Sequence, residues 1–204
     1  MSTSILTGDI IKSRAHKNSD VWINVLKQAF AHLKLNKYSW SIYRGDSFQI
    51  ELYDTTSGFI AATYIKACIK TIKNLDVRLA IGIGEKTYKG NMVAESNGPA
   101  YLYSGETLET LKKDKQNLKI KTTDPDTNET LNVCFKLALI AMDTWTANSA
   151  EIVKLSIENP NALQSELGKI IGINQNAVSM RQKRAHLTEI LELDQLYRKK
   201  INTL

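Results

Sequence analysis

Two aspartates, each directly after a glycine, are the residues of this chain best suited to do chemistry. Asp9 lies in "SILTGDIIKSR" and Asp46 in "SIYRGDSFQIEL", so each sits beside an apolar run that is typical of a buried strand. Carboxylate oxygens are the ligands that Mg²⁺ and Mn²⁺ prefer, and a pair of such ions can polarise the attacking and leaving oxygens of a phosphoryl transfer. Gly-Asp pairs are also common turn formers, so a purely structural role is the alternative.

Residues next to the two aspartates could bind phosphate. The segment after Asp9 leads toward a predicted helix, where free backbone amides and two cations could receive phosphate oxygens. The candidate phosphate-binding residues are Ile11, Lys12, Ser13, Arg14 and Arg44. Exposed charges usually have no specific role, so Lys12 and Arg14 could equally be a solvated first turn, and Arg44 could pair with Asp46. Glu85, at the end of a later strand, could be a further ligand or a solvated strand-end residue.

Hydrophobic periodicity predicts the elements that must position these side chains. They are, in order, a strand at 4–10, a helix at 19–35, a hairpin of strands 37–44 and 47–53, a helix at 56–74 and a strand at 77–85. This order predicts an α+β fold with an antiparallel sheet and helices on one face. It brings Asp9 and Asp46 to the same end of adjacent central strands.

The second half of the chain turns from mixed to helical. A helix is predicted over 99–113 and a further hairpin over 117–135, with its loop at Asp124-Pro125-Asp126. From residue 135 onward the pattern is wholly helical. We therefore expect two domains, an α+β domain at 1–134 and a helical connector with a C-terminal domain at 135–204.

The segment "ALQSELGKIIGINQNAVSMRQKRAHL" has the spacing of a helix-turn-helix. Gly172 suits the left-handed residue that ends the first helix, Ile173 fills the turn, and Asn174 can cap the second helix. The basic run "RQKRAH" favours DNA as the partner, although a helical hairpin packed against the first domain has the same physics. Gln182 stands where similar helices usually carry leucine.

The second helix of such a unit enters the major groove of DNA. Amide side chains can bind adenine edges and basic side chains can bind phosphates. The candidate DNA-binding residues are Asn174, Gln175, Asn176, Ser179, Met180, Arg181, Lys183 and Arg184.

Composition agrees with a polyanionic partner and argues against a membrane protein. The 204 residues carry a formal net charge of +6, which is weak support for nucleic-acid binding. No apolar run reaches the ~18 residues that a membrane span requires, and no secretion signal is recognisable. Cys68 and Cys134 lack metal-ligand spacing and are expected to be reduced thiols. We expect a cytoplasmic protein.

Four motifs together resemble the SatD family of bacterial proteins over most of the chain: "GDIIKSR", "RGDSFQ", "RLAIGIGE" and "SNGPAYLYSGETLETL". More distantly, the element order and both aspartates resemble class III nucleotide cyclases and GGDEF-type palm domains. That resemblance implies a ferredoxin-like or cyclase-like sheet. It also implies Mg²⁺ or Mn²⁺ ligands at Asp9, Asp46 and the Ile10 carbonyl, phosphate contacts at 11–14, and a homodimer.

The chain departs from the cyclase pattern at the residues that would drive turnover. Ile42 stands where cyclases carry a base-reading lysine, and Leu102 and Gly105 stand where they carry an asparagine and an arginine. We therefore expect a DNA-binding transcriptional regulator whose cyclase-like domain binds metal and nucleotide or mediates dimerisation. The alternatives are a nucleotide cyclase or other nucleotidyl-transfer enzyme using Asp9, Asp46 and two metal ions, and a scaffold that binds neither.

Overall fold

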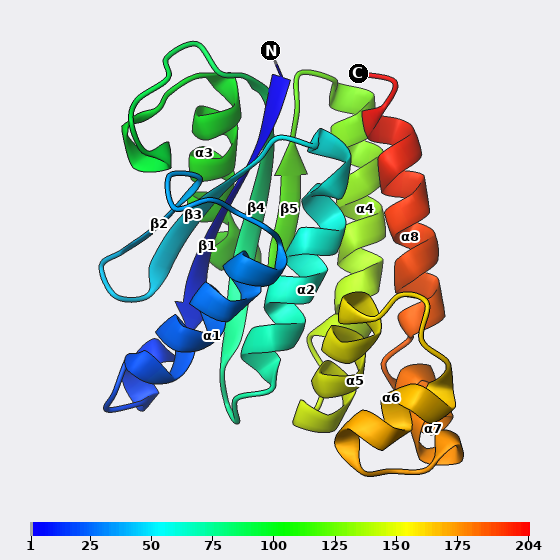
Figure 1. Ribbon diagram of the computed structural model, residues 1–204. Coiled ribbons are helices and arrows are strands. Elements are labelled where there is room, and N and C mark those ends of the chain that lie inside the picture. Colours follow the sequence, from blue (N-terminus) through cyan, green and yellow to red (C-terminus); the bar gives the residue numbers. More distant parts are fainter. Residues whose placement is uncertain (1) are drawn as a thin grey trace.

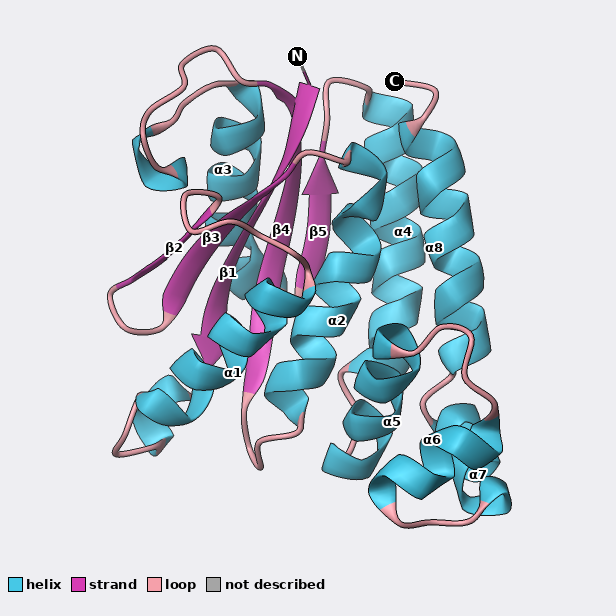
Figure 2. Cartoon of the chain, viewed as in Figure 1, coloured by secondary structure: helices cyan, strands magenta, loops and turns pink. Residues whose placement is uncertain are grey.

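The computed structural model describes residues 2–204 and has at its centre a five-stranded sheet (Figures 1 and 2). The strand order is β2-β3-β1-β4-β5, so β1 lies in the middle. The strands are β1 (Ser2–Ile11), β2 (Trp40–Tyr43), β3 (Ser47–Leu52), β4 (Asp76–Glu85) and β5 (Leu118–Lys121). The first four pair antiparallel, whereas β5 runs parallel to β4.

Alternate side chains of β1 divide the molecule into two layers. Leu6 and Ile10 join the main core with α1 (Asp20–His32) and α2 (Gly58–Lys70), which cover one face of the sheet. Ile5 faces the other way and packs with Ala100 and Tyr101 of α3 (Pro99–Asp114), behind the sheet in Figure 1. The predicted α+β class is confirmed. Two details differ from the prediction, because the sheet is mixed and α3 covers its second face.

Small residues in β4 let α3 lie close to the sheet. A Cβ atom on Gly82 would come within 2.2 Å of the Ala100 carbonyl oxygen and 2.5 Å of the Ser104 nitrogen. Gly84 meets Pro99 in the same way, at 3.1 Å. The glycines of "AIGIGE" thus supply the space that the helix occupies.

The predicted second strand of the 117–135 hairpin is wrong, because α4 (Pro125–Met142) begins there. Asp124 accepts a hydrogen bond from the Thr127 amide, and Pro125 occupies the first turn, so the Asp-Pro pair starts a helix instead of closing a hairpin. The amide side chains of Asn128 and Asn132 then bond the backbone of Thr122 and Ile120, each through one donor and one acceptor. These side chains take the place of a further strand at the edge of β5.

Four helices follow β5 and α4 on the same side as α2. They are α5 (Ala147–Glu158), α6 (Gln164–Ile171), α7 (Gln175–Arg184) and α8 (Leu187–Ile201). The core runs on through the predicted domain boundary, since Phe59 of α2 stacks on Phe135 of α4 and the Tyr197 hydroxyl of α8 donates to the Thr55 carbonyl. None of the helices formed by residues 2–204 combines the length and apolar composition that crossing a membrane requires.

Short 3₁₀ turns complete the chain: η1 (Ser13–Ala15), η2 (Thr55–Ser57) and η3 (Val93–Glu95). The first of them matters for the site. The segment after Asp9 leads through η1 to α1, which starts at Asp20, close to the start of the helix predicted at 19–35. Residues 11–14 thus precede the N-terminus of α1 and are separated from it by residues 15–19.

Candidate functional site

Asp9 lies near the end of the central strand, on the face that α3 covers. Its neighbours across the sheet are Ser47 of β3 and Arg78 of β4. The Arg78 Nη1 atom donates to Asp9 Oδ2 at 2.9 Å, and both side chains are partly buried. The other carboxylate oxygen, Oδ1, is buried without a hydrogen-bond partner among the described residues. Asp9 thus keeps one strong acceptor unused.

Asp46 lies in the β2–β3 turn, directly beside Asp9's neighbour Ser47. Arg44 and Gly45 both adopt positive φ angles, 55° and 80°, which form the tight turn that the sequence predicts. The Trp22 indole donates to the Gly45 carbonyl at 3.0 Å, and the Ser13 hydroxyl donates to Asp46 Oδ2 at 2.8 Å. The turn is thereby fixed from two sides.

The two carboxylates lie at a common edge of the sheet. The Ile10 amide donates to the Asp46 carbonyl at 2.9 Å, which ties the turn to the end of β1. Burial raises the pKa of Asp9 above its usual value of 3.8, Arg78 opposes that shift, and the negative charge of Asp46 adds to it. The strand register gives the same placement, since Asp46 directly precedes Ser47, the residue that Asp9 faces on β3.

A divalent cation would fit this arrangement only with ligands from outside the protein. The free Oδ1 of Asp9 is the acceptor that a cation would satisfy, and Asp46 is tied to the same strand end through the Ile10 amide. Across residues 2–204, no group of three or more histidine, cysteine, aspartate or glutamate side chains could hold a metal ion. Mg²⁺ commonly completes its shell with water and phosphate oxygens, which two carboxylates and a carbonyl allow.

The predicted phosphate-binding residues separate into two groups. One group, at the β2–β3 turn, consists of Ser13, Arg14 and Arg44. Ser13 is buried and donates to Asp46, whereas both arginines are exposed. Ile11 and Lys12 instead line a cavity beyond the strand ends. Glu85 cannot join the site, because antiparallel pairing puts it opposite Ser2, at the far end of β1 from Asp9.

Three residues near Asp9 were not predicted from the sequence. Arg78 pairs with it, and the positive charge of Lys112 on α3 lowers its pKa. Burial of part of the Tyr43 side chain raises the pKa of its hydroxyl, Arg44 opposes that shift, and the charge of Asp9 adds to it. The alternation of β4 held a signal, since Arg78 faces away from its apolar neighbours Val77 and Leu79. Only the pairing of β4 with β1 shows that it meets Asp9.

The helix-turn-helix segment forms helices α6 and α7, joined by a tight turn. Gly172 has a left-handed φ of 69°, and the Ile173 amide donates to the Gly168 carbonyl. Gly168 is needed for this turn, since a Cβ atom there would lie 2.5 Å from the Ile173 carbonyl oxygen. The Asn174 side chain caps α7 through the Ala177 amide, and Val178 is fully buried.

Most of the predicted DNA-binding residues are exposed on α7. They are Asn174, Gln175, Asn176, Ser179, Met180, Lys183 and Arg184. Arg181 differs, because its guanidinium turns toward α5 and donates to Glu151 at 2.8 Å. Gln182 also faces inward and bonds Ser156 and Gln164, which explains how an amide replaces the expected leucine. Arg181 and Gln182 position α7 and leave the outer face to the others.

The match to a family model covers nearly the whole of this architecture. Residues 4–196 match the model of the SatD family, from the start of β1 to the middle of α8. The chain belongs to the SatD family. No curated protein matches the sequence.

Membership of the SatD family ties the two candidate sites together. The matched region includes Asp9 and Asp46 as well as the whole of α6 and α7. The carboxylate edge and helices α6 and α7 thus both lie within the residues that the family model matches. The family description itself names no activity.

Proposed function

We propose that this SatD family protein is a DNA-binding transcriptional regulator whose α+β part binds a divalent metal and a nucleotide. The observation that carries the proposal is the outer face of α7, where polar and basic side chains are exposed while Val178 is buried beneath them. Exposed amides and cations on the second helix of such a unit suit the major groove.

The spacing on α7 supports direct contact with base edges. Four polar or basic residues share the exposed side of the helix and are spaced one to four positions apart in the sequence: Gln175, Asn176, Ser179 and Lys183. An asparagine or glutamine can donate to and accept from adenine, while Lys183 and Arg184 can neutralise phosphates. Arg181 contributes indirectly, because its ion pair with Glu151 holds α7 on α5.

Fluorescence anisotropy with fragments of the host genome tests the DNA proposal. The double variant Asn176→Ala/Lys183→Ala should lose binding, while Lys199→Ala, an exposed lysine near the end of α8, should not. Wild-type affinity should fall steeply as salt rises. Failure to bind any duplex even at low salt would refute the DNA role.

Metal and nucleotide binding is proposed at Asp9 and Asp46. The support is the unpartnered Asp9 Oδ1 beside a second carboxylate. Calorimetry with Mn²⁺ and nucleoside triphosphates should give binding in the wild type that Asp9→Asn and Asp46→Asn remove. Asp20→Asn, an exposed aspartate at the start of α1, is the matched control. Equal binding in all three variants would contradict the assignment.

Nucleotidyl transfer, including nucleotide cyclisation, is the second candidate. It is favoured by Arg78 and Lys112, which bring two positive charges to Asp9. The chain has no arginine at the position of the cyclase arginine, and these two cations could take its place. Cations so placed could stabilise charge that develops on a phosphate. Incubation with triphosphates and Mn²⁺, followed by chromatography, separates the candidates. Nucleotide binding without any product would refute nucleotidyl transfer and support only the regulatory role.

We propose homodimerisation through α4 and α8. Val133, Leu137 and Ile140 form a row on α4 with 56%, 63% and 72% exposure, beside a groove that Ile190 and Leu193 of α8 also line. A contiguous exposed apolar surface is a common mark of a protein–protein contact. Lys136 on α4 and Glu189 on α8 flank it with opposite charges, so two copies related by a twofold axis could pair them.

Sedimentation equilibrium tests the dimer. Leu137→Glu should shift the protein toward monomer because it places a charge in the apolar row. Lys199→Glu, exposed elsewhere on α8, should leave the equilibrium unchanged. A wild-type protein that stays monomeric at high concentration would refute the interface.

A further inference from the structure

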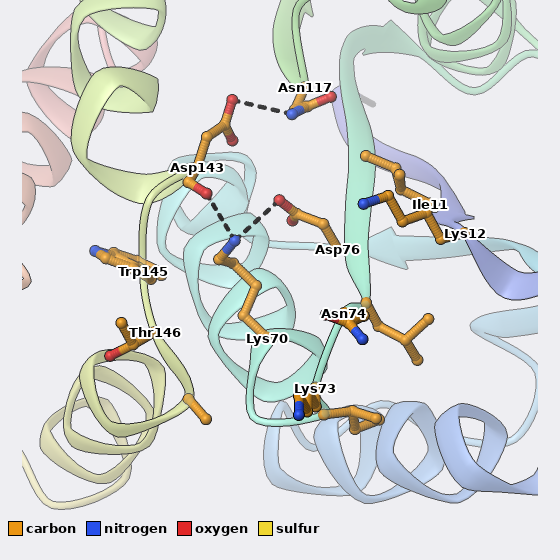
Figure 3. A pocket seen from close by; sticks show the side chains of 13 residues that line it. Ile11, Lys12, Lys70, Lys73, Asn74, Asp76, Asn117, Asp143, Trp145 and Thr146 are labelled. Atoms are coloured by element: carbon orange, nitrogen blue, oxygen red, sulfur yellow. Dashed lines mark hydrogen bonds and ion pairs between the residues drawn. The ribbon is translucent and has the colours of Figure 1, made fainter. Parts of the chain in front are cut away.

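A cavity of about 610 Å³ opens between the ends of β1 and β4 and the start of α5 (Figure 3). Figure 3 shows Ile11 and Lys12 on the strand side, Trp145 and Thr146 opposite them, and Lys70 with Asp76 between the two. The cavity is separate from the carboxylate edge, because Asp9 points to the α3 face whereas the cavity lies past the strand ends. Nothing proposed so far uses it.

The floor of the cavity is a network of opposite charges. Lys70, with 9% of its side chain exposed, pairs with Asp76 Oδ2 at 3.1 Å and donates to the Asp143 carbonyl at 2.8 Å. Lys66 lies beneath with 1% exposure, 2.6 Å from Asp76 and 2.7 Å from Asp143. Two lysines and two aspartates cancel, so the floor itself is neutral.

The rim carries an excess of positive charge. Lys12 and Lys73 both line the cavity, and neither has a carboxylate within 4.0 Å in the described part of the chain. The backbone of Lys12 is left-handed, with φ of 65°. Two unpaired ammonium groups facing one cavity give it a local charge that suits a dianion.

The uncharged part of the cavity lining suits a ligand in which the phosphate is esterified to an organic group. The N-terminal turn of α5, capped by Thr146, opens on the cavity, and backbone amides there favour an anion. Trp145, Ile72 and Leu75 supply an apolar wall, and Asn74 and Asn117 supply amide groups. We propose that this cavity binds a small metabolite of the phosphate-monoester class, with its phosphate between Lys12 and Lys73.

Trp145 connects the cavity to the DNA-binding helix. Its indole nitrogen donates to the carbonyl of Ala185, the residue directly after α7, in a buried hydrogen bond of 2.9 Å. A ligand that contacts the indole ring is therefore linked to the C-terminal end of α7 through this single hydrogen bond. The phosphate monoester then regulates DNA binding, a consequence that rests on the proposed DNA function, whereas the site itself does not.

Calorimetry with glucose 6-phosphate, glycerol 3-phosphate, inorganic phosphate and succinate tests the site. Lys73→Gln and Lys12→Gln should each weaken the binding of a phosphate monoester at least about tenfold, the loss expected for one charge-assisted hydrogen bond. Lys27→Gln, which replaces an exposed lysine on α1, should leave it unchanged. In ¹⁵N spectra the Trp145 indole resonance should shift on binding.

Three results would overturn the site: no binding of either monoester at millimolar concentration, equal binding in Lys73→Gln, or succinate bound more tightly than the monoesters. The regulatory step is tested by repeating the DNA titration with saturating monoester, where DNA affinity should change severalfold. Unchanged affinity would overturn the coupling. A protein that binds the monoester but no DNA would refute the DNA function and leave the site in place.

Discussion

The Asp9 carboxylate and the Arg78 guanidinium face each other across β1 and β4, with Oδ2 2.9 Å from Nη1. The two residues are direct neighbours in the strand register, so the backbone itself sets the contact. Arg78 occupies one carboxylate oxygen and leaves the buried Oδ1 without a partner. A buried acceptor of this kind is costly unless something satisfies it. Arg78 therefore controls how the Asp9 site behaves toward protons and cations.

Replacing Arg78 should raise the pKa of Asp9 further. Burial already holds this pKa above 3.8, and Arg78 is the main opposing charge. A folded-state pKa above the unfolded one means that stability falls as pH rises through that interval, so Arg78→Gln should enlarge the fall. Carboxyl ¹³C titration measures the pKa. Lys112→Gln should give a smaller upward shift, and a downward shift in Arg78→Gln would contradict the electrostatic account.

The same variant should bind Mn²⁺ more tightly. Arg78→Gln frees Oδ2 and removes a repelling charge, so we expect a gain of up to about fivefold, which corresponds to the ~1 kcal/mol of a partly exposed ion pair. Calorimetry in the absence of nucleotide measures it. Asp9→Asn in the same background should abolish the gain. Weaker Mn²⁺ binding in Arg78→Gln would mean that Arg78 supports the cation indirectly.

Cys68 should be inert toward thiol reagents in the native protein. Burial raises the pKa of its thiol to about 12, so almost no thiolate exists near pH 8. Cys134 is only half-buried. Ellman's reagent should thus detect at most one thiol in folded wild type, none in Cys134→Ser, and both in denaturant. Rapid labelling of Cys68 in the folded Cys134→Ser variant would contradict this burial.

The parts of the fold that could be predicted depend on local signals. Alternating apolar residues indicate β1, β3 and β4, and the Gly172 and Asn174 pair marks the boundaries of α6 and α7. The common edge of Asp9 and Asp46 follows from strand order alone. In these segments the local sequence preference and the tertiary contacts favour the same conformation.

The parts that could not be predicted depend on distant contacts. The sequence predicts the second strand of a hairpin between the Asp124-Pro125-Asp126 loop and residue 135, yet these residues belong to α4, where Asn128 and Asn132 bond the edge of β5. Asp124-Pro125 is compatible with either a turn or a helix start, and the tertiary contacts decide between them. Arg78 was missed for the same reason, since only the β1–β4 register reveals its partner.

Gly82→Ala should destabilise the protein while Gly105→Ala should not. At Gly82 the new methyl group would meet backbone atoms of α3, which cannot move aside like a flexible side chain, so a loss of about 1–3 kcal/mol is expected. Gly105 lies within α3 with no atom within 4 Å of the added Cβ, and alanine there should stabilise by about 0.5–1 kcal/mol. Urea unfolding measures both. A neutral Gly82→Ala would mean that α3 can shift away from the sheet.

Lys66→Met should be the most damaging of these changes. Lys66 is almost fully buried between Asp76 and Asp143, so its removal leaves two carboxylates near each other without their shared cation. Breaking a buried ion pair from one side costs about 3–5 kcal/mol, whereas Lys121→Met, in an exposed pair with Glu106, should cost at most about 1 kcal/mol. The double variant Lys66→Met/Asp76→Asn should recover part of the loss, because one stranded charge is removed with the lysine. Midpoints of urea unfolding compare the three proteins, and a double variant less stable than Lys66→Met alone would show that Asp76 stabilises the fold through Lys70 instead.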